Sequence, residues 1–317
     1  MSFDRLQAQS LSPPAADQVL LPVLAVVAGA VAMGVSPIFV RLADVGPFAS
    51  AFWRVALALP LLWAWMRWDT GSATGAVTLT PDGRALAPIV IAGVLFAGDL
   101  VFWHLAIMKT TVANATFFAT MAPLVTALAA AVILRERMAR TTLAGFVLCA
   151  AGAALILGSS LRIDPDRLVG DGLGIVTAMF FGLYMVAVKL ARRRVPTSAL
   201  MFWSTLVTAL ILLAIAAVAE PRLLPASVGG LVILLSLAIV SHIGGQGLLA
   251  YALGHLPATF SSLVIFLEAV AAAALGYLVL GEHITLFQVL GGVAIVGGIY
   301  VARPRNRRPK VPAATTT

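Results

Sequence analysis

The chain contains one pattern of apolar segments twice, and this duplication constrains its fold more than any single motif does. Residues 113–152 align with residues 259–298 at a shift of 146, which places Glu136 on Glu282 and Gly145 on Gly291. Earlier in each copy, residues 52–53 (Phe-Trp) align with residues 202–203 at a shift of 150, and Gly34 aligns with Gly182 at a shift of 148. Duplicated apolar halves predict two similar multi-helix units with a shared interface, an arrangement typical of secondary transporters.

The composition places both copies in lipid. The chain is 61% hydrophobic and 11% charged, whereas soluble domains carry about 25% charged residues. The apolar runs are continuous and do not alternate with a period of two, which excludes a membrane β-barrel. The sequence therefore predicts an all-α membrane protein with ten transmembrane helices, at residues 19–41, 48–66, 86–108, 112–134, 142–161, 170–190, 198–218, 228–253, 257–280 and 285–302.

Five helices in each copy is an odd number, so the second copy enters the membrane from the opposite side. The sequence thus predicts two inverted five-helix repeats. We expect four parts, which are an N-terminal cytoplasmic tail (1–18), a first repeat (19–161), a second repeat (162–302) and a basic, disordered C-terminal tail (303–317).

The net charge of +8 is distributed as in a membrane protein and not as in a nucleic-acid-binding protein. The face with both termini would carry fifteen basic residues: Arg5, Arg67, Arg84, Arg135, Arg137, Arg140, Lys189, Arg192, Arg193, Arg194, Arg303, Arg305, Arg307, Arg308 and Lys310. The other face would carry five: Arg41, Lys109, Arg162, Arg167 and Arg222. The positive-inside rule then predicts a multi-pass protein of the plasma membrane (the inner membrane of a bacterium) with both termini cytoplasmic.

Several segments carry a family likeness. They are FWR at 52–54, GDLVFWHLAI at 98–107 and APLVTALAAAVILRER at 122–137, with GQGLLAYALGHLPATFSSL at 245–263 and LEAVAAAALGYLVLGE at 267–282. The chain resembles the drug/metabolite transporter superfamily, in particular its EamA-type bacterial members, over about residues 20–302. The resemblance implies a ten-helix carrier that alternates between inward and outward states and commonly exports amino acids or related small metabolites. The family often has proline directly after the glutamate of the ninth helix, where this chain has Ala269, so we expect a softer kink beside Glu268.

Charged residues inside the predicted spans are the leading site candidates, because each costs about 2.5–3.5 kcal/mol on insertion scales. Glu268 lies midway along the ninth span, where desolvation favours the protonated form of a carboxylate. It either binds a substrate amine or a proton, or forms a permanent ion pair with an arginine. Asp99 has Trp103 four residues later on the same helix face, and the two together suit an organic cation. The alternatives are a capping or pairing role for Asp99 and an interfacial role for Trp103.

Other candidates are weaker. Arg54 either reaches the outer interface or attracts a carboxylate. His242 and Gln246 share a helix face, and His242 either takes part in a proton path or is a hydrogen-bonded core residue. Tyr184 and Trp203 are candidate lining aromatics for which packing is the alternative.

The remaining repeated features favour structural roles. Glu136 and Glu282 occupy equivalent helix ends, where they would cap the next helix or pair with arginine. The equivalent glycines of the fifth and tenth helices favour close helix contact, either as a scaffold or as a homodimer surface; they are Gly145, Gly152, Gly291 and Gly298.

These features predict a secondary transporter that exports small polar metabolites, most of all amino acids, by alternating access between the repeats. Its partners would be the small-molecule substrate, the lipid bilayer and, as a coupling ion, the proton. The alternatives are a drug or nucleobase/nucleoside exporter, an intramembrane enzyme and a non-transporting scaffold. No nucleotide-binding loop or catalytic motif is present, and a single cysteine, Cys149, excludes a thiolate metal cluster. We therefore expect no enzyme activity, no cofactor and no metal.

Overall fold

The computed structural model describes residues 16–72, 83–110, 112–136, 138–158, 165–280 and 283–303, and every regular element in these ranges is helical. The helices of the first half are α2 (Ala16–Gly34), α3 (Ser36–Leu42), α4 (Pro47–Ala56), α5 (Leu59–Ser72), α6 (Gly83–Lys109), α7 (Val112–Ala119), α8 (Ala122–Ala129), η1 (Ala130–Leu134) and α9 (Arg140–Leu157). Those of the second half are η2 (Pro165–Arg167), α10 (Leu168–Arg192), α11 (Thr197–Ala219), α12 (Val228–Ser236), η3 (Leu237–Gln246), α13 (Gly247–His255), α14 (Ala258–Val264), α15 (Leu267–Leu280) and α16 (Leu286–Ala302).

These elements form spans of membrane-crossing length. In the described ranges, nine helical segments are long and apolar enough to cross a membrane, and α16 is a shorter apolar helix. The chain is thus an all-α membrane protein, and each of the nine segments overlaps one of the spans predicted from the sequence. The predicted tails lie mostly outside the described residues.

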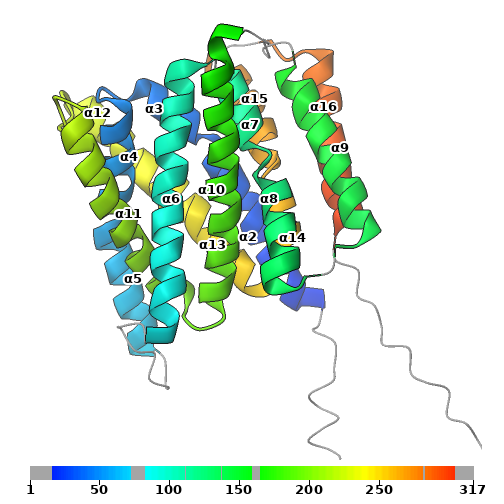
Figure 1. Ribbon diagram of the computed structural model, residues 1–317, viewed down its shortest axis with the longest axis horizontal. Coiled ribbons are helices and arrows are strands. Elements are labelled where there is room, and N and C mark those ends of the chain that lie inside the picture. Colours follow the sequence, from blue (N-terminus) through cyan, green and yellow to red (C-terminus); the bar gives the residue numbers. More distant parts are fainter. Residues whose placement is uncertain are drawn as a thin grey trace, which may run out of the picture.

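The two halves run through the bundle in opposite directions. In Figure 1, α2 rises from the face where α16 ends, whereas α10, at the start of the second half, descends toward that face. We call the face where α2 begins and α16 ends the termini face, and the other the opposite face. The helices pack in pairs across the halves: α6 with α10, α4 and α5 with α11, α2 with η3 and α13, and α9 with α16.

Glycines set the closest of these contacts. A Cβ atom added at Gly145 on α9 would lie 2.5 Å from the carbonyl oxygen of Gly298, and one at Gly152 would lie 2.5 Å from that of Gly291. Between them, the Cys149 thiol donates a hydrogen bond to the Ile295 carbonyl oxygen at 3.4 Å. The four glycines for which the sequence predicted close helix contact therefore lie between α9 and α16 of the same chain.

Several spans are interrupted near their middle. The breaks at Val35, residues 57–58 and residues 120–121 each have a proline within three residues on the C-terminal side. The ninth span also breaks, between α14 and α15 at Ile265 and Phe266, although Ala269 replaces the family's proline. There the Ile265 and Phe266 N–H groups bond three residues back, to Ser262 and Leu263. Tightened backbone turns therefore interrupt this helix without proline, and the softness of the kink stays a prediction.

Acidic side chains tie the helix ends of one half to the other. Glu136, after η1, accepts hydrogen bonds from the N–H groups of Ala258 (3.1 Å) and Thr259 (3.3 Å) at the start of α14. Glu220, after α11, accepts from the N–H groups of Phe48 (2.6 Å) and Ala49 (3.2 Å) at the start of α4. Each carboxylate satisfies free N–H groups at the positive end of a helix.

The first of these contacts corrects the predicted partner of Glu136. The sequence predicted either a cap on the next helix or a pair with arginine, whereas Glu136 caps a helix of the other half. Its repeat counterpart Glu282 lies outside the described residues.

Candidate functional site

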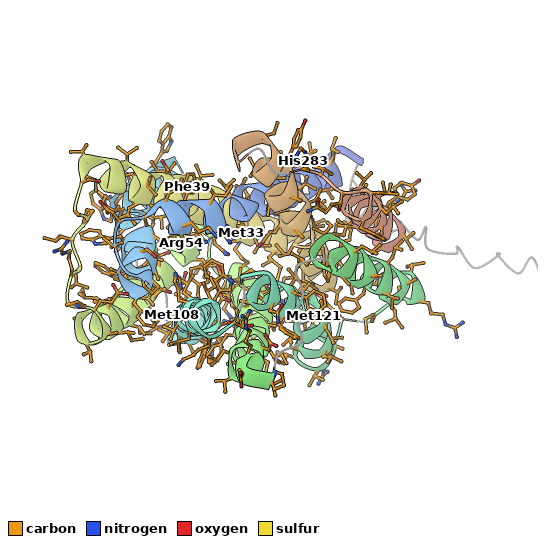
Figure 2. The ribbon with its side chains drawn as sticks, turned by 90° about the horizontal axis from the view of Figure 1, so that it is seen from above. Met33, Phe39, Arg54, Met108, Met121 and His283 are labelled. Atoms are coloured by element: carbon orange, nitrogen blue, oxygen red, sulfur yellow. The ribbon has the colours of Figure 1, made fainter. Side chains whose placement is uncertain are left out.

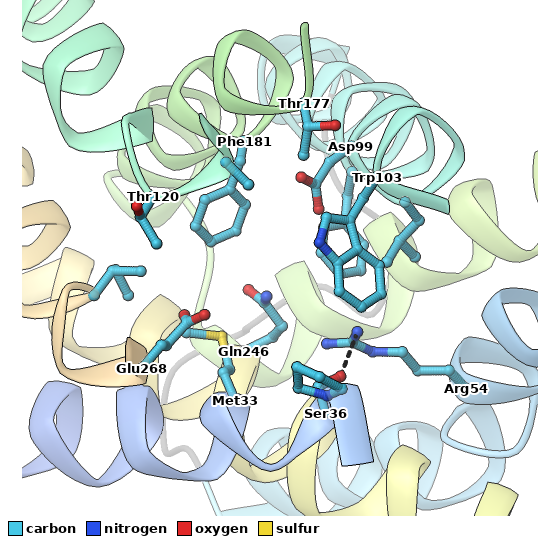
Figure 3. Close-up of a pocket in the computed structure, with 15 residues that line it drawn as sticks. Met33, Ser36, Arg54, Asp99, Trp103, Thr120, Thr177, Phe181, Gln246 and Glu268 are labelled. Atoms are coloured by element: carbon cyan, nitrogen blue, oxygen red, sulfur yellow. Dashed lines mark hydrogen bonds between the residues drawn. The ribbon is translucent and has the colours of Figure 1, made fainter. Parts of the chain in front are cut away.

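A cavity of about 110 Å³ lies between the two halves of the bundle. It is lined from both halves by Met33, Ser36, Pro37, Arg54, Phe96, Asp99, Leu100, Trp103, Ala119, Thr120, Thr177, Phe181, Gln246, Ile265 and Glu268. Figure 3 shows Arg54, Asp99 and Glu268 around this space, on three different helices. Seen along the helices in Figure 2, Met33 and Arg54 lie toward the middle of the bundle. Five of the eight residues predicted from the sequence thus line one cavity: Arg54, Asp99, Trp103, Gln246 and Glu268.

Helix breaks and close packing place the two carboxylates. Glu268 is the second residue of α15, immediately after the break at residues 265–266, and Asp99 lies in the unbroken helix α6. Gly34 lets α2 approach the backbone of Glu268, since a Cβ atom there would lie 2.9 Å from the Glu268 carbonyl oxygen. Neither carboxylate has a hydrogen bond or an ion pair with any residue that the structure describes. This conformation therefore contains no ion pair between Glu268 and any described arginine, which was the alternative to a substrate-binding or proton-binding role.

Arg54 is the cation of the cavity. Its side chain is 6% exposed, so it does not reach the outer interface, and the prediction of an interfacial Arg54 was wrong. The guanidinium donates one hydrogen bond, from Nη1 to Ser36 Oγ at 3.1 Å, and lies 5.8 Å from the centroid of the Phe96 ring. Its Nε is buried without a hydrogen-bond partner among the described residues, while the charges of Asp99 and Glu268 both attract the guanidinium. The buried guanidinium thus keeps donor capacity for a ligand.

One wall of the cavity is aromatic. Phe96, Trp103 and Phe181 line it, and Tyr184 and His242 lie behind Phe96, with ring centroids at 5.0 Å and 5.5 Å. Tyr184 and His242 are both buried and support the wall instead of lining it. Trp203 does not line the cavity, and its indole packs on Phe202 at 5.1 Å between centroids.

The eighth span contributes polar atoms through a local distortion. The π-helix η3 spans Leu237–Gln246, and such segments often mark functional sites. His242 Nε2 lies 2.8 Å from Thr205 Oγ1, while His242 Nδ1 and Gln246 Oε1 are buried and have no hydrogen-bond partner in the part of the chain that the structure describes. The distortion places the Gln246 side chain at the cavity with an open acceptor.

Sequence reasoning missed most of the uncharged lining, although the repeat contained a signal for it. At the shifts that align the copies, Met33 corresponds to Phe181 (148) and Ala119 to Ile265 (146), and all four residues line the cavity. Positions that face a pseudo-symmetry axis in one repeat face it in the other, so aligned pairs would have identified these residues.

The same alignment shows that the charge of the site is asymmetric. The repeat counterparts of the three charged residues are neutral: Ser204 for Arg54 (shift 150), Gln246 for Asp99 (shift 147, which places Gly98 on Gly245) and Ala122 for Glu268 (shift 146). The two halves that build the cavity are therefore similar in sequence pattern but contribute different charges to it.

Comparison with known proteins identifies the family. The model of the EamA-like transporter family matches residues 20–158 and again residues 168–303. The chain belongs to the EamA-like transporter family. The same family model therefore describes both halves of the chain, and each half contributes residues to the cavity.

Two relatives of this transporter illustrate the range of the family. An uncharacterized transporter of Archaeoglobus fulgidus is 26% identical over 281 residues, which cover 86% of this chain and 93% of the relative. The pseudopaline exporter CntI of Pseudomonas aeruginosa is 27% identical over 245 residues, which cover 77% and 82% of the two chains. A solved crystal structure with 19% identity and a TM-score of 0.74, covering 90% of this chain and 96% of its own, has the same fold.

Proposed function

We propose that this transporter exports small metabolites that carry both an amine and a carboxylate, most of all amino acids or related compounds. The observation that carries the proposal is the cavity's charge, which consists of Asp99, Glu268 and Arg54 without internal ion pairs. A substrate ammonium suits the carboxylates and the face of Trp103. A substrate carboxylate suits Arg54, which has an unused Nε donor.

The proposed export is by alternating access, in a plasma membrane with both termini cytoplasmic. The cavity of about 110 Å³ is smaller than the roughly 300–1,000 Å³ of typical ligand pockets, so this conformation must open to admit a substrate. The basic residues assigned to the termini face support the cytoplasmic placement, and the relative named as a pseudopaline exporter supports outward transport.

Proton coupling is part of the proposal. Asp99 and Glu268 outnumber Arg54 in the cavity, so one negative charge is left over when both are ionised. That charge is balanced either by the substrate amine or by a proton, and competition between the two would couple their movements. A homodimer remains a prediction, and it would have to use surfaces other than the glycine faces that join α9 to α16.

A second candidate function rests on the aromatic wall. Phe96, Trp103 and Phe181 present ring faces and edges on which a nucleobase or a planar drug would stack. Such a ligand would use Asp99 or Glu268 for a ring or side-chain amine and would not need Arg54.

The test is transport by the purified protein in liposomes, with a panel of radiolabelled amino acids, nucleosides and cationic dyes, with and without a pH gradient. We expect saturable amino-acid transport that the substitution Glu268→Gln abolishes. The matched control is Asp166→Asn, which removes a carboxylate from the 3-10 turn before α10, outside the cavity, and should transport normally. Transport of nucleosides or dyes alone would favour the second candidate, and unchanged transport by Glu268→Gln would reject the proposed role of Glu268.

A further inference from the structure

A second pocket lies at the termini face between the ends of α6 and α10. It has a volume of about 410 Å³ and is lined by Arg84 and Pro88 from α6, Leu190 from α10, and Arg193 and Arg194 directly after it. Figure 1 shows α6 and α10 running side by side to this face. Three arginines from two separate segments therefore converge on one hollow at the end of the bundle.

The three arginine side chains have no hydrogen bond or ion pair with any residue that the structure describes. Two neighbouring cations, in contrast, have hydrogen-bond partners. Lys189 donates to the Leu256 carbonyl oxygen at 2.6 Å, and Arg192 donates to the Val195 carbonyl oxygen at 2.6 Å. Like charges that converge raise the free energy of the folded chain unless an anion lies among them. The pocket thus has the charge and the unused donors of an anion site.

The helix dipole, which favours basic residues at the C-terminal end of a helix, explains only two of these three arginines. Arg193 and Arg194 follow the C-terminus of α10, where the helix dipole favours cations. Arg84 is the second residue of α6, whose first turn contains no acidic residue, and the dipole disfavours a cation there. The positive-inside rule accounts for a basic residue on this face, but it does not require three arginines to line one pocket.

Apolar surface continues from the pocket toward the middle of the bundle. On α6, Pro88 and Ile91 follow Arg84 at spacings of four and seven residues, which place them on one helix face. On α10, Val186 lies four residues before Leu190 and is buried, so the exposed apolar strip follows α6. Ile91 is exposed on the bundle surface, so an acyl chain beside the pocket would contact apolar side chains of α6.

We propose that this pocket binds the phosphate of an anionic phospholipid, with the headgroup among Arg84, Arg193 and Arg194 and an acyl chain along Pro88 and Ile91 of α6. Guanidinium groups bind phosphate oxygens through paired hydrogen bonds, and basic pockets between membrane helices suit anionic headgroups. The lipid would bridge α6 and α10, the helices that carry Asp99 and Phe181 of the cavity. The inference does not depend on which substrate the cavity binds.

The experiment is native mass spectrometry of the full-length protein, released from nanodiscs that contain equal amounts of phosphatidylglycerol and phosphatidylcholine. We expect one phosphatidylglycerol to remain bound to the wild type. Each basic residue near an anionic surface contributes roughly five-fold in affinity, so the variant R84Q/R193Q/R194Q should bind on the order of 100-fold more weakly. The three single variants should each lose about five-fold, and they keep the test valid if the triple variant does not fold.

The matched control is R305Q/R307Q/R308Q, which removes three arginines after α16 and leaves the pocket unchanged. It should retain the lipid as the wild type does. Equal lipid loss in both triple variants would show that general surface charge binds the lipid and would overturn the proposed pocket. Retention of the lipid by R84Q/R193Q/R194Q would also overturn it. Displacement of the lipid by millimolar inorganic phosphate would overturn the lipid assignment in favour of a free phosphate site.

Discussion

Gly34 lies against the backbone of Glu268, and a Cβ atom at position 34 would be 2.9 Å from the Glu268 carbonyl oxygen and 2.8 Å from Ala271 Cβ. The repeat counterpart Gly182 has the same relationship to Ala122, with 2.8 Å to its carbonyl oxygen. Both halves therefore use a glycine to bring a helix against the fourth or ninth span. Only in the ninth span does that position carry a charge.

The first prediction follows from this contact. Gly34→Ala should push α2 away from α15 beside the cavity, lower stability by about 1–3 kcal/mol as overpacking does, and strongly reduce transport. The measurements are thermal unfolding in detergent and transport in liposomes. Gly172→Ala on α10 is the matched control, because its Cβ would meet no described atom within 4 Å. A Gly34→Ala protein as stable and active as Gly172→Ala would show that the close approach is dispensable.

The second prediction concerns the donor side of the cavity. Arg54→Gln removes the guanidinium that Ser36 orients, and a hydrogen bond to a charged group contributes about 1.5–3 kcal/mol. For a substrate with a carboxylate, KM should therefore rise about 10- to 100-fold. For the corresponding decarboxylated amine, KM should change little. Equal increases for both compounds would mean that Arg54 supports the cavity without binding a carboxylate.

The third prediction is that the contact of Glu136 with α14 helps to keep the cavity closed toward the termini face. Glu136→Ala removes the cap on Ala258 and Thr259, which is worth about 1 kcal/mol, and should raise the population open to that face about five-fold. The readout is labelling of a cysteine at the lining position Ala119 by an impermeant thiol reagent, in a Cys149→Ala background.

The control for this closure is Glu220→Ala, which removes the corresponding cap at the opposite face. It should not increase labelling of the Ala119→Cys reporter from the termini face. If the two variants respond equally, or if Glu136→Ala does not respond, the Glu136 contact does not close the cavity.

The fourth prediction concerns orientation. A cysteine in place of Ala314 in the C-terminal tail should be inaccessible to an impermeant reagent added outside intact cells. A cysteine in place of the exposed Ala226, between α11 and α12 at the opposite face, should react. The reverse pattern would place the termini outside and would contradict the charge distribution argued from the sequence.

The sequence by itself determined the architecture and most of the charged site. Lipid excludes unpaired backbone groups and charges, so continuous apolar runs had to be helices, and the few charges within them were visible as exceptions. Glu268, Asp99 and Arg54 stood out for that reason alone. The internal repeat located helix contacts such as those of Gly145 and Gly152.

Only the tertiary structure decided how these residues meet. Most faces of a membrane helix are apolar, so spacing does not fix the rotation of the helix. The sequence therefore could not show that Arg54 faces the cavity, that Trp203 does not, or that Glu136 caps a helix of the other half. It also could not show the break beside Glu268, which backbone turns make without a proline. Those outcomes depend on which helices lie in contact, and that is a property of the packed bundle.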